Sequence, residues 1–266
     1  MWSFAVLFTV GTWVVAFIVF LACLAAAEVG YLLGRRGAKS GTAKKEHMGA
    51  VQAAVAALLG LLLAFSVSMA VSRFEARKAA VVEEANAIGT AHLRASLLPE
   101  PQRSQAERLF ARYVEVRLEL ARPDWYLNAE HDLREEEAAL QQQQWSLGAE
   151  VAEQDRRAVT SGLYLEALNE MIDSAARRDH GLRNHVPESL IYLIGAVAML
   201  TLGLMGYVSG LAGGRSLTAV VVLSLMITAV LFVILDFDRP YRGILTVRQL
   251  SMVEVQETIE RGLPLP

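Results

Sequence analysis

Four long apolar blocks dominate the pattern of hydrophobic and polar positions along this chain. They cover residues 2–33, 48–71, 189–211 and 217–235, and the second and fourth contain no charged residue. About 20 consecutive apolar residues suffice to cross a bilayer as a helix. Blocks of this length and composition favour transmembrane spans over buried helices of a soluble protein. The first block is longer than a bilayer requires, which indicates a tilted or overhanging helix.

Most of the charged residues lie between the second and third blocks, where helical patterning predominates. Proline and glycine punctuate this segment into predicted helices over residues 73–98, 102–121, 129–147 and 149–178. The first of them continues the second apolar block without an interrupting proline. One face of it carries apolar side chains at approximately helical spacing, namely Val81, Ala85, Ile88 and Leu93. A further short helix is predicted over residues 251–261.

These elements predict an all-α, four-transmembrane-helix membrane protein with a helical domain inserted between the second and third spans. The predicted boundaries place spans one and two in residues 1–71 and the extramembrane domain in 72–186. Spans three and four then occupy residues 187–236, and a C-terminal tail occupies 237–266.

The short loops between spans carry the positive charge that predicts orientation. The loop after span one holds five basic residues and one acid, and the loop after span three holds Arg215. Basic residues in short loops mark the cytoplasmic side. We therefore expect a multi-pass membrane protein with both termini and the central domain outside the cytoplasm.

Composition narrows the possible functions. The net charge is −3 and the sequence pI about 6.0, so no basic surface is expected to attract nucleic acid. The single cysteine, Cys23, lies inside an apolar block and is interpreted as a small buried side chain. No phosphate-binding loop, HExxH or GxSxG motif occurs, so neither an enzyme nor a metal or cofactor site is expected.

Four motifs stand out along the chain, namely LGLLLAF at 59–65, RFEAR at 73–77, VEEANAIGT at 82–90 and DFDRPYRG at 236–243. Together they resemble a family of bacterial membrane proteins described as bestrophin-like. The resemblance covers nearly the whole chain and implies the bacterial inner membrane as its location. It implies a relation to bestrophins, which are pentameric anion channels lined by their second helix. The resemblance therefore implies a homo-oligomer, and the relation to bestrophins implies a pentamer. It also implies inorganic ions and the lipid bilayer as partners.

A stripe of small or polar residues marks one face of span two. It comprises Gly49, Gln52, Ala53, Ala57, Gly60, Ala64 and Ser68. Small faces permit close helix packing, and they also leave room for ions in a pore-lining helix, so both interpretations stay open. In span three, Gly206 and Gly210 match the small-xxx-small packing motif. Glu28, near the end of span one, is either a salt-bridge partner at the interface or a residue of an ion pathway.

Charged residues near the ends of the spans suggest two further sites. Copies of Glu83, Glu84 and Asn86 around an axis would form a ring that concentrates cations at a pore mouth; charge pairs on a solvated helix are the alternative. An Asp–Arg lock between the end of span four and the start of the span-two extension is also predicted, with a structural role favoured over a catalytic one. Its members are Arg73, Arg77, Asp236, Asp238 and Arg239.

The favoured function is an oligomeric ion channel with span two lining the pore. The resemblance favours anions and the carboxylates favour cations, so the selectivity stays open. The alternative is a membrane-anchored sensory or scaffolding protein that acts through a partner.

Overall fold

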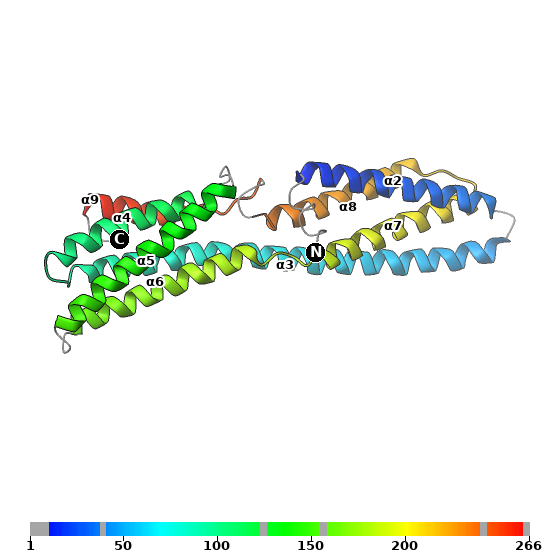
Figure 1. Ribbon diagram of the computed structural model, residues 1–266. Helices are drawn as coiled ribbons and strands as arrows, with labels where there is room; N and C mark the ends of the chain where they lie inside the picture. Colours follow the sequence, from blue (N-terminus) through cyan, green and yellow to red (C-terminus); the bar gives the residue numbers. More distant parts are fainter. Residues whose placement is uncertain (1–10, 38–40, 123–126, 155–158, 240–243, 263–266) are drawn as a thin grey trace. The chain divides into compact units, whose positions relative to one another are not determined.

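The computed structural model describes residues 11–37, 41–122, 127–154, 159–239 and 244–262, and within these residues the regular structure is helical (Figure 1). The helices are α2 (Thr12–Arg36), α3 (Gly41–Ala95), α4 (Gln102–Glu119), α5 (Leu127–Gln154), α6 (Val159–Arg183), α7 (Glu188–Leu211), α8 (Leu217–Phe237) and α9 (Leu250–Arg261). The predicted all-α class is therefore confirmed. The start of the predicted first span, residues 2–10, lies outside the described residues.

Four helical stretches are long and apolar enough to cross a membrane. They are α2, the stretch Glu46–Ala95 of α3, the stretch Val159–Leu211 that contains α7, and α8. The predicted second, third and fourth spans each fall in one of these stretches, and α2 covers the predicted first span from Thr12 onward. Their length and composition confirm the prediction of four candidate spans.

The second span and the helix after it form one uninterrupted element. Helix α3 runs for 55 residues, as the absence of proline in this stretch predicted. It contributes to two compact units, which divide within it between Arg73 and Phe74 and again between Asn184 and His185. The apolar unit holds α2, the first part of α3, α7 and α8. The polar unit holds the rest of α3 with α4, α5, α6 and α9.

Close backbone contact joins α2 to α7 in the apolar unit, where the two helices lie side by side (Figure 1). A Cβ on Gly30 would stand 1.9 Å from the Gly203 carbonyl oxygen, and one on Gly206 would stand 1.9 Å from the Ala27 carbonyl oxygen. Only glycine fits at such distances. The small-residue motif of span three therefore serves helix packing, as it does in many membrane proteins.

Side chains from α3, α4, α5, α6 and α9 form the core of the polar unit. Its largest fully buried apolar members include Ile88, Phe110, Tyr113, Tyr164 and Met171. On α3, Val81 and Ala85 are buried as predicted, but Leu93 is 48% exposed. Leu93 follows Ile88 by five positions, which rotates it off the shared face.

The predicted helix break near residue 148 is wrong. Helix α5 continues through Gly148 to Gln154. A Cβ on Gly148 would stand 2.6 Å from the Leu165 Cδ2 atom and 3.0 Å from the Tyr164 Cδ1 atom. The glycine is present because α6 packs closely at that point, and it does not end the helix.

Candidate functional site

The small-residue stripe of span two lies on an uncovered face of α3. Ala53, Ala57, Gly60, Ala64 and Ser68 are all exposed. A Cβ added to Gly60 would meet no atom within 4 Å, so none of the helices that the structure describes uses the space that the glycine leaves. Gly49 is likewise open, and Gln52 is half-buried. The opposite side of α3 packs into the apolar core through Leu59 and Ala70.

The exposed surface of α3 has two chemically different strips. Beside the small residues stand Leu58, Leu61 and Phe65, which are 49%, 54% and 64% exposed. Large apolar side chains are what a helix presents to acyl chains, whereas small ones suit a close contact or an open path. Hereafter the small-residue stripe is called the small face, and the three large residues are called the large face.

Glu28 forms a salt bridge at the end of the spans. Its carboxylate pairs with the Arg215 guanidinium, and both side chains are about half exposed. The Arg215 Cζ atom lies 5.1 Å from the centroid of the Tyr31 ring, within cation–π range. Of the two interpretations of Glu28, the structure thus shows the salt-bridge partner.

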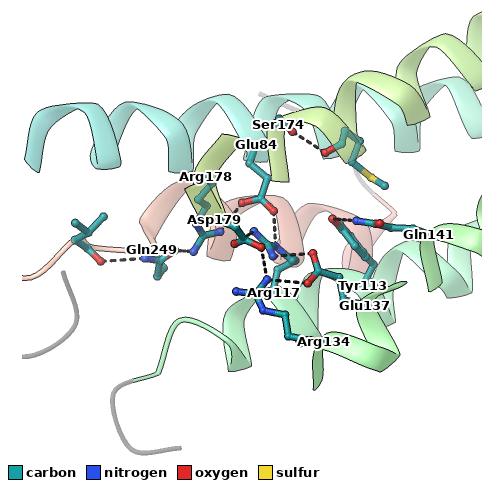
Figure 2. A network of polar contacts seen from close by, with 12 residues as sticks. Glu84, Tyr113, Arg117, Arg134, Glu137, Gln141, Ser174, Arg178, Asp179 and Gln249 are labelled. Carbon is teal, nitrogen blue, oxygen red and sulfur yellow. Dashed lines mark hydrogen bonds and ion pairs between the residues drawn. The ribbon is translucent and has the colours of Figure 1, made fainter. Parts of the chain in front are cut away.

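Glu84 lies at the centre of a buried ion network in the polar unit (Figure 2). Its carboxylate accepts hydrogen bonds from the Arg117 Nε atom and the Arg178 Nη1 atom. Glu84 is 0% exposed, and the two arginines are 2% and 3% exposed. The carboxylate is thus held by two cations in the core and does not face solvent.

Further acids and a third arginine complete this network. Arg117 also donates to Glu137 at 2.7 Å and to Asp179 at 3.3 Å. Arg134 donates to the same two carboxylates. Three arginines therefore meet three carboxylates, and the side chains come from α3, α4, α5 and α6. Buried charges are tolerated only in such paired arrangements.

The neighbouring acids keep the buried arginines charged. Burial of Arg117 favours loss of its proton, but the carboxylates of Glu84 and Glu137 outweigh burial and raise the pKa of Arg117 well above its ordinary value. The same balance raises the pKa of Arg134, where Asp179 supplies the largest opposing attraction. Arg117 and Arg134 therefore keep their positive charges within the network.

Glu83 and Asn86 lie on the surface of the same unit. Glu83 pairs with Arg177 at 2.7 Å, and Arg177 also pairs with Glu170 at 2.6 Å. Asn86 is exposed. Of the three residues proposed for a charged ring, these two are accessible in a single chain. The ring itself stays a prediction.

The lock candidates at the end of α8 make hydrogen bonds to backbone N–H groups. Asp236 is 2% exposed and accepts from Ile244 at 3.1 Å and from Leu245 at 3.0 Å. Asp238 accepts from the Val186 N–H at 3.0 Å, which joins the end of α8 to the segment before α7. Arg239, directly after Asp238, is buried.

The two arginines of α3 contact backbone carbonyls. Arg73 donates to the His185 carbonyl within the apolar unit. Arg77 is 2% exposed and donates to the carbonyls of Gly181 at 3.1 Å and Asn184 at 2.9 Å. A cation at the C-terminal end of a helix satisfies carbonyls that lack partners there, so Arg77 closes the end of α6. A direct Asp–Arg lock stays a prediction.

Comparison with known proteins decides the family. The Bestrophin-like domain family matches residues 6–252, which is well over half of the chain. This chain belongs to the bestrophin-like family. No curated protein and no solved structure is similar enough to it to count as a match. Family membership and the four apolar helices together make the bestrophin-like chain a multi-pass membrane protein.

The buried network of this bestrophin-like chain was not found by sequence reasoning, although a signal for it exists. Glu84 follows Val81 by three positions and precedes Ile88 by four, so it lies on the apolar face of α3. Arg117 lies on the buried face of α4 with Tyr113 in the same way. A charged residue on the apolar face of a helix predicts a buried partner of opposite charge. Among the residues described, no group of three or more His, Cys, Asp or Glu is placed to hold a metal ion.

Proposed function

We propose that this bestrophin-like protein is an oligomeric ion channel whose pore is lined by the small face of α3. The observation that carries the proposal is the exposure of Ala53, Ala57, Gly60, Ala64 and Ser68 in a single chain. The large apolar side chains of the separate large face are suited to contact with the acyl chains of lipids. The small face is then available for a hydrated path or for neighbouring copies.

An oligomer follows from the number of small faces that each subunit supplies. One α3 offers one such face, and a path for hydrated ions needs several of them around an axis. Closed rings of identical subunits provide this arrangement. We propose a homo-oligomer, and the family's relation to bestrophins favours a pentamer.

The ion pairs of the polar unit bear on selectivity. The charge of Glu84 is balanced by two buried arginines, so Glu84 does not supply the negative ring that would favour cations. Glu83 and Asn86 are the accessible ring candidates, and Glu83 is itself paired with Arg177. The structural argument for cations is thus weaker than the sequence alone suggested, and we leave the selectivity to measurement.

The proposed topology places the polar unit as a helical domain between spans two and three, outside the cytoplasm. The basic short loop after span one supports this orientation. Attachment of a membrane-impermeant thiol reagent to Glu166→Cys in intact cells would support it. Labelling of that position only after the cells are opened would overturn it.

Ion flux from liposomes tests the channel proposal. Full-length protein is reconstituted, and the reversal potential and flux are measured under a KCl gradient. Ala64→Leu narrows the proposed path and should abolish most of the flux. Leu61→Phe changes a side chain on the large face and should leave the flux unchanged. The mass of the purified complex is measured in parallel.

Two outcomes would contradict the proposal. If a correctly folded oligomer gives no flux, the protein is not an ion channel. If the purified protein is a monomer, no ring of subunits forms, and the sensory or scaffolding alternative is favoured. If flux occurs, a change in selectivity in Glu83→Gln but not in Glu166→Gln would identify Glu83 as a ring residue.

A further inference from the structure

A pocket of about 370 Å³ lies in the apolar unit, beside the salt bridge of Glu28 and Arg215. Its walls come from α2, α7 and the start of α8, and they are mainly apolar. These walls include Leu24, Tyr31, Leu217, Val220 and Val221. The volume falls within the range of about 300–1,000 Å³ that is typical of small-molecule sites.

The position of the pocket determines what can enter it. Leu217 and Val221 are 56% and 43% exposed, so the pocket opens toward the surroundings of the spans. A bilayer surrounds these helices, and water does not fill an apolar recess that opens to acyl chains. An acyl chain is therefore the natural occupant of the apolar part.

The polar end of the pocket carries both signs of charge. Arg215 precedes α8 by two residues, so this end lies where the span begins. Its guanidinium suits a phosphate, for which arginine has matching donor geometry. The Glu28 carboxylate and the Tyr31 ring suit an ammonium group, through charge and cation–π attraction. Both ionic side chains are half exposed, so each retains capacity for a ligand.

We propose that this pocket binds a phospholipid with an amine headgroup. Its phosphate contacts Arg215, its ammonium contacts Glu28 and Tyr31, and one acyl chain lies against Leu24, Val220 and Val221. The site is separate from the small face of α3 and does not depend on the channel proposal.

Lipid binding to the purified full-length protein in detergent tests the site, with native mass spectrometry as the readout. The probes are phosphatidylethanolamine, phosphatidylglycerol, diacylglycerol and inorganic phosphate. Phosphatidylethanolamine should bind most tightly and phosphatidylglycerol less tightly. Diacylglycerol and inorganic phosphate should bind weakly, because each lacks one half of the ligand.

Matched variants assign the contacts. Arg215→Gln should weaken the binding of both phospholipids about fivefold. This corresponds to the ~1 kcal/mol that one basic residue contributes at a lipid surface. Glu28→Gln should weaken only the binding of phosphatidylethanolamine, so the protein should no longer prefer phosphatidylethanolamine to phosphatidylglycerol. Arg36→Gln changes an exposed arginine at the end of the same helix α2 and should have no effect.

A pair of bulky substitutions tests the apolar part and keeps the charged residues intact. Val221→Trp fills the pocket and should reduce binding of both phospholipids, whereas Val222→Trp, on a neighbouring exposed position, should not. Equal binding by the parent protein and Val221→Trp would overturn the proposal, as would equal losses in Arg215→Gln and Arg36→Gln. Dissociation of the oligomer in Val221→Trp with unchanged lipid binding would show that the pocket is a subunit contact and would also overturn it.

Discussion

Glu83 and Glu84 are adjacent in the sequence, but the structure predicts very different costs for removing them. Glu84→Ala leaves Arg117 and Arg178 in the core without their shared carboxylate. Arg117 keeps two acids, whereas Arg178 keeps the Gln249 amide oxygen at 2.7 Å, which carries no charge. Removing one partner of a buried ion pair costs about 3–5 kcal/mol. We expect Glu84→Ala to lie in that range.

Glu83→Ala is the matched control for this prediction. The side chain is 53% exposed, and its partner Arg177 is 46% exposed. Exposed pairs contribute about 0–1 kcal/mol. Thermal unfolding of the full-length protein, followed by circular dichroism, should therefore show a large fall in Tm for Glu84→Ala. The fall should be roughly 10 °C, and that of Glu83→Ala should be no more than a few degrees.

A double variant separates the ionic interaction from the loss of side-chain volume. Glu84→Ala and Arg178→Ala together remove both charges of one pair, so their combined cost should be clearly less than the sum of the two single costs. Additive costs, or a Glu84→Ala protein as stable as Glu83→Ala, would refute the conclusion that the network is a buried, mutually dependent ionic structure.

Three further perturbations test other parts of the structure. Gly206→Val should lower the yield of folded protein, because the valine side chain would meet the backbone of α2. Gly195→Val should not lower it, because the position has open space, and size-exclusion profiles of the two variants measure the difference. Asp236→Ala leaves two backbone N–H groups without their acceptor and should cost about 1–3 kcal/mol in unfolding experiments. The hydrogen bond from Arg112 lowers the pKa of Glu136, so this pair stabilises the fold above the ordinary carboxyl pKa and is lost as the pH falls through the lowered value. The stability difference between Glu136→Gln and the parent should thus be at most about 1 kcal/mol at neutral pH and should vanish in acid.

The sequence predicted the elements whose signal is local. Four apolar blocks of bilayer length predicted four candidate spans, and the lack of proline after residue 71 predicted the continuous α3. The pair Gly206 and Gly210 predicted a close helix contact, and the structure places both glycines against the backbone of α2. Hydropathy and small-residue spacing are properties of one helix, so no knowledge of tertiary contacts was needed.

Features that depend on contacts between distant segments were not predictable in this way. Glu84 and Arg178 are 94 residues apart, and no pattern in either helix says that the two side chains meet. A glycine such as Gly148 often marks a helix break, but here it permits close packing, because Tyr164 and Leu165 lie against it. The exposure of the small face of α3 likewise required the positions of the neighbouring helices.

The accessibility of the small face to ions is the central claim, and a thiol reaction in reconstituted liposomes tests it most directly. Cys23→Ala removes the native thiol, and single cysteines are placed at Ala64 on the small face and at Phe65 on the large face. A small, water-soluble, uncharged thiol reagent can enter a pore of either selectivity, and it should reduce the flux of Ala64→Cys and leave that of Phe65→Cys unchanged. A flux that the reagent leaves unchanged in Ala64→Cys, or reduces equally in both variants, would contradict a pore lined by this face.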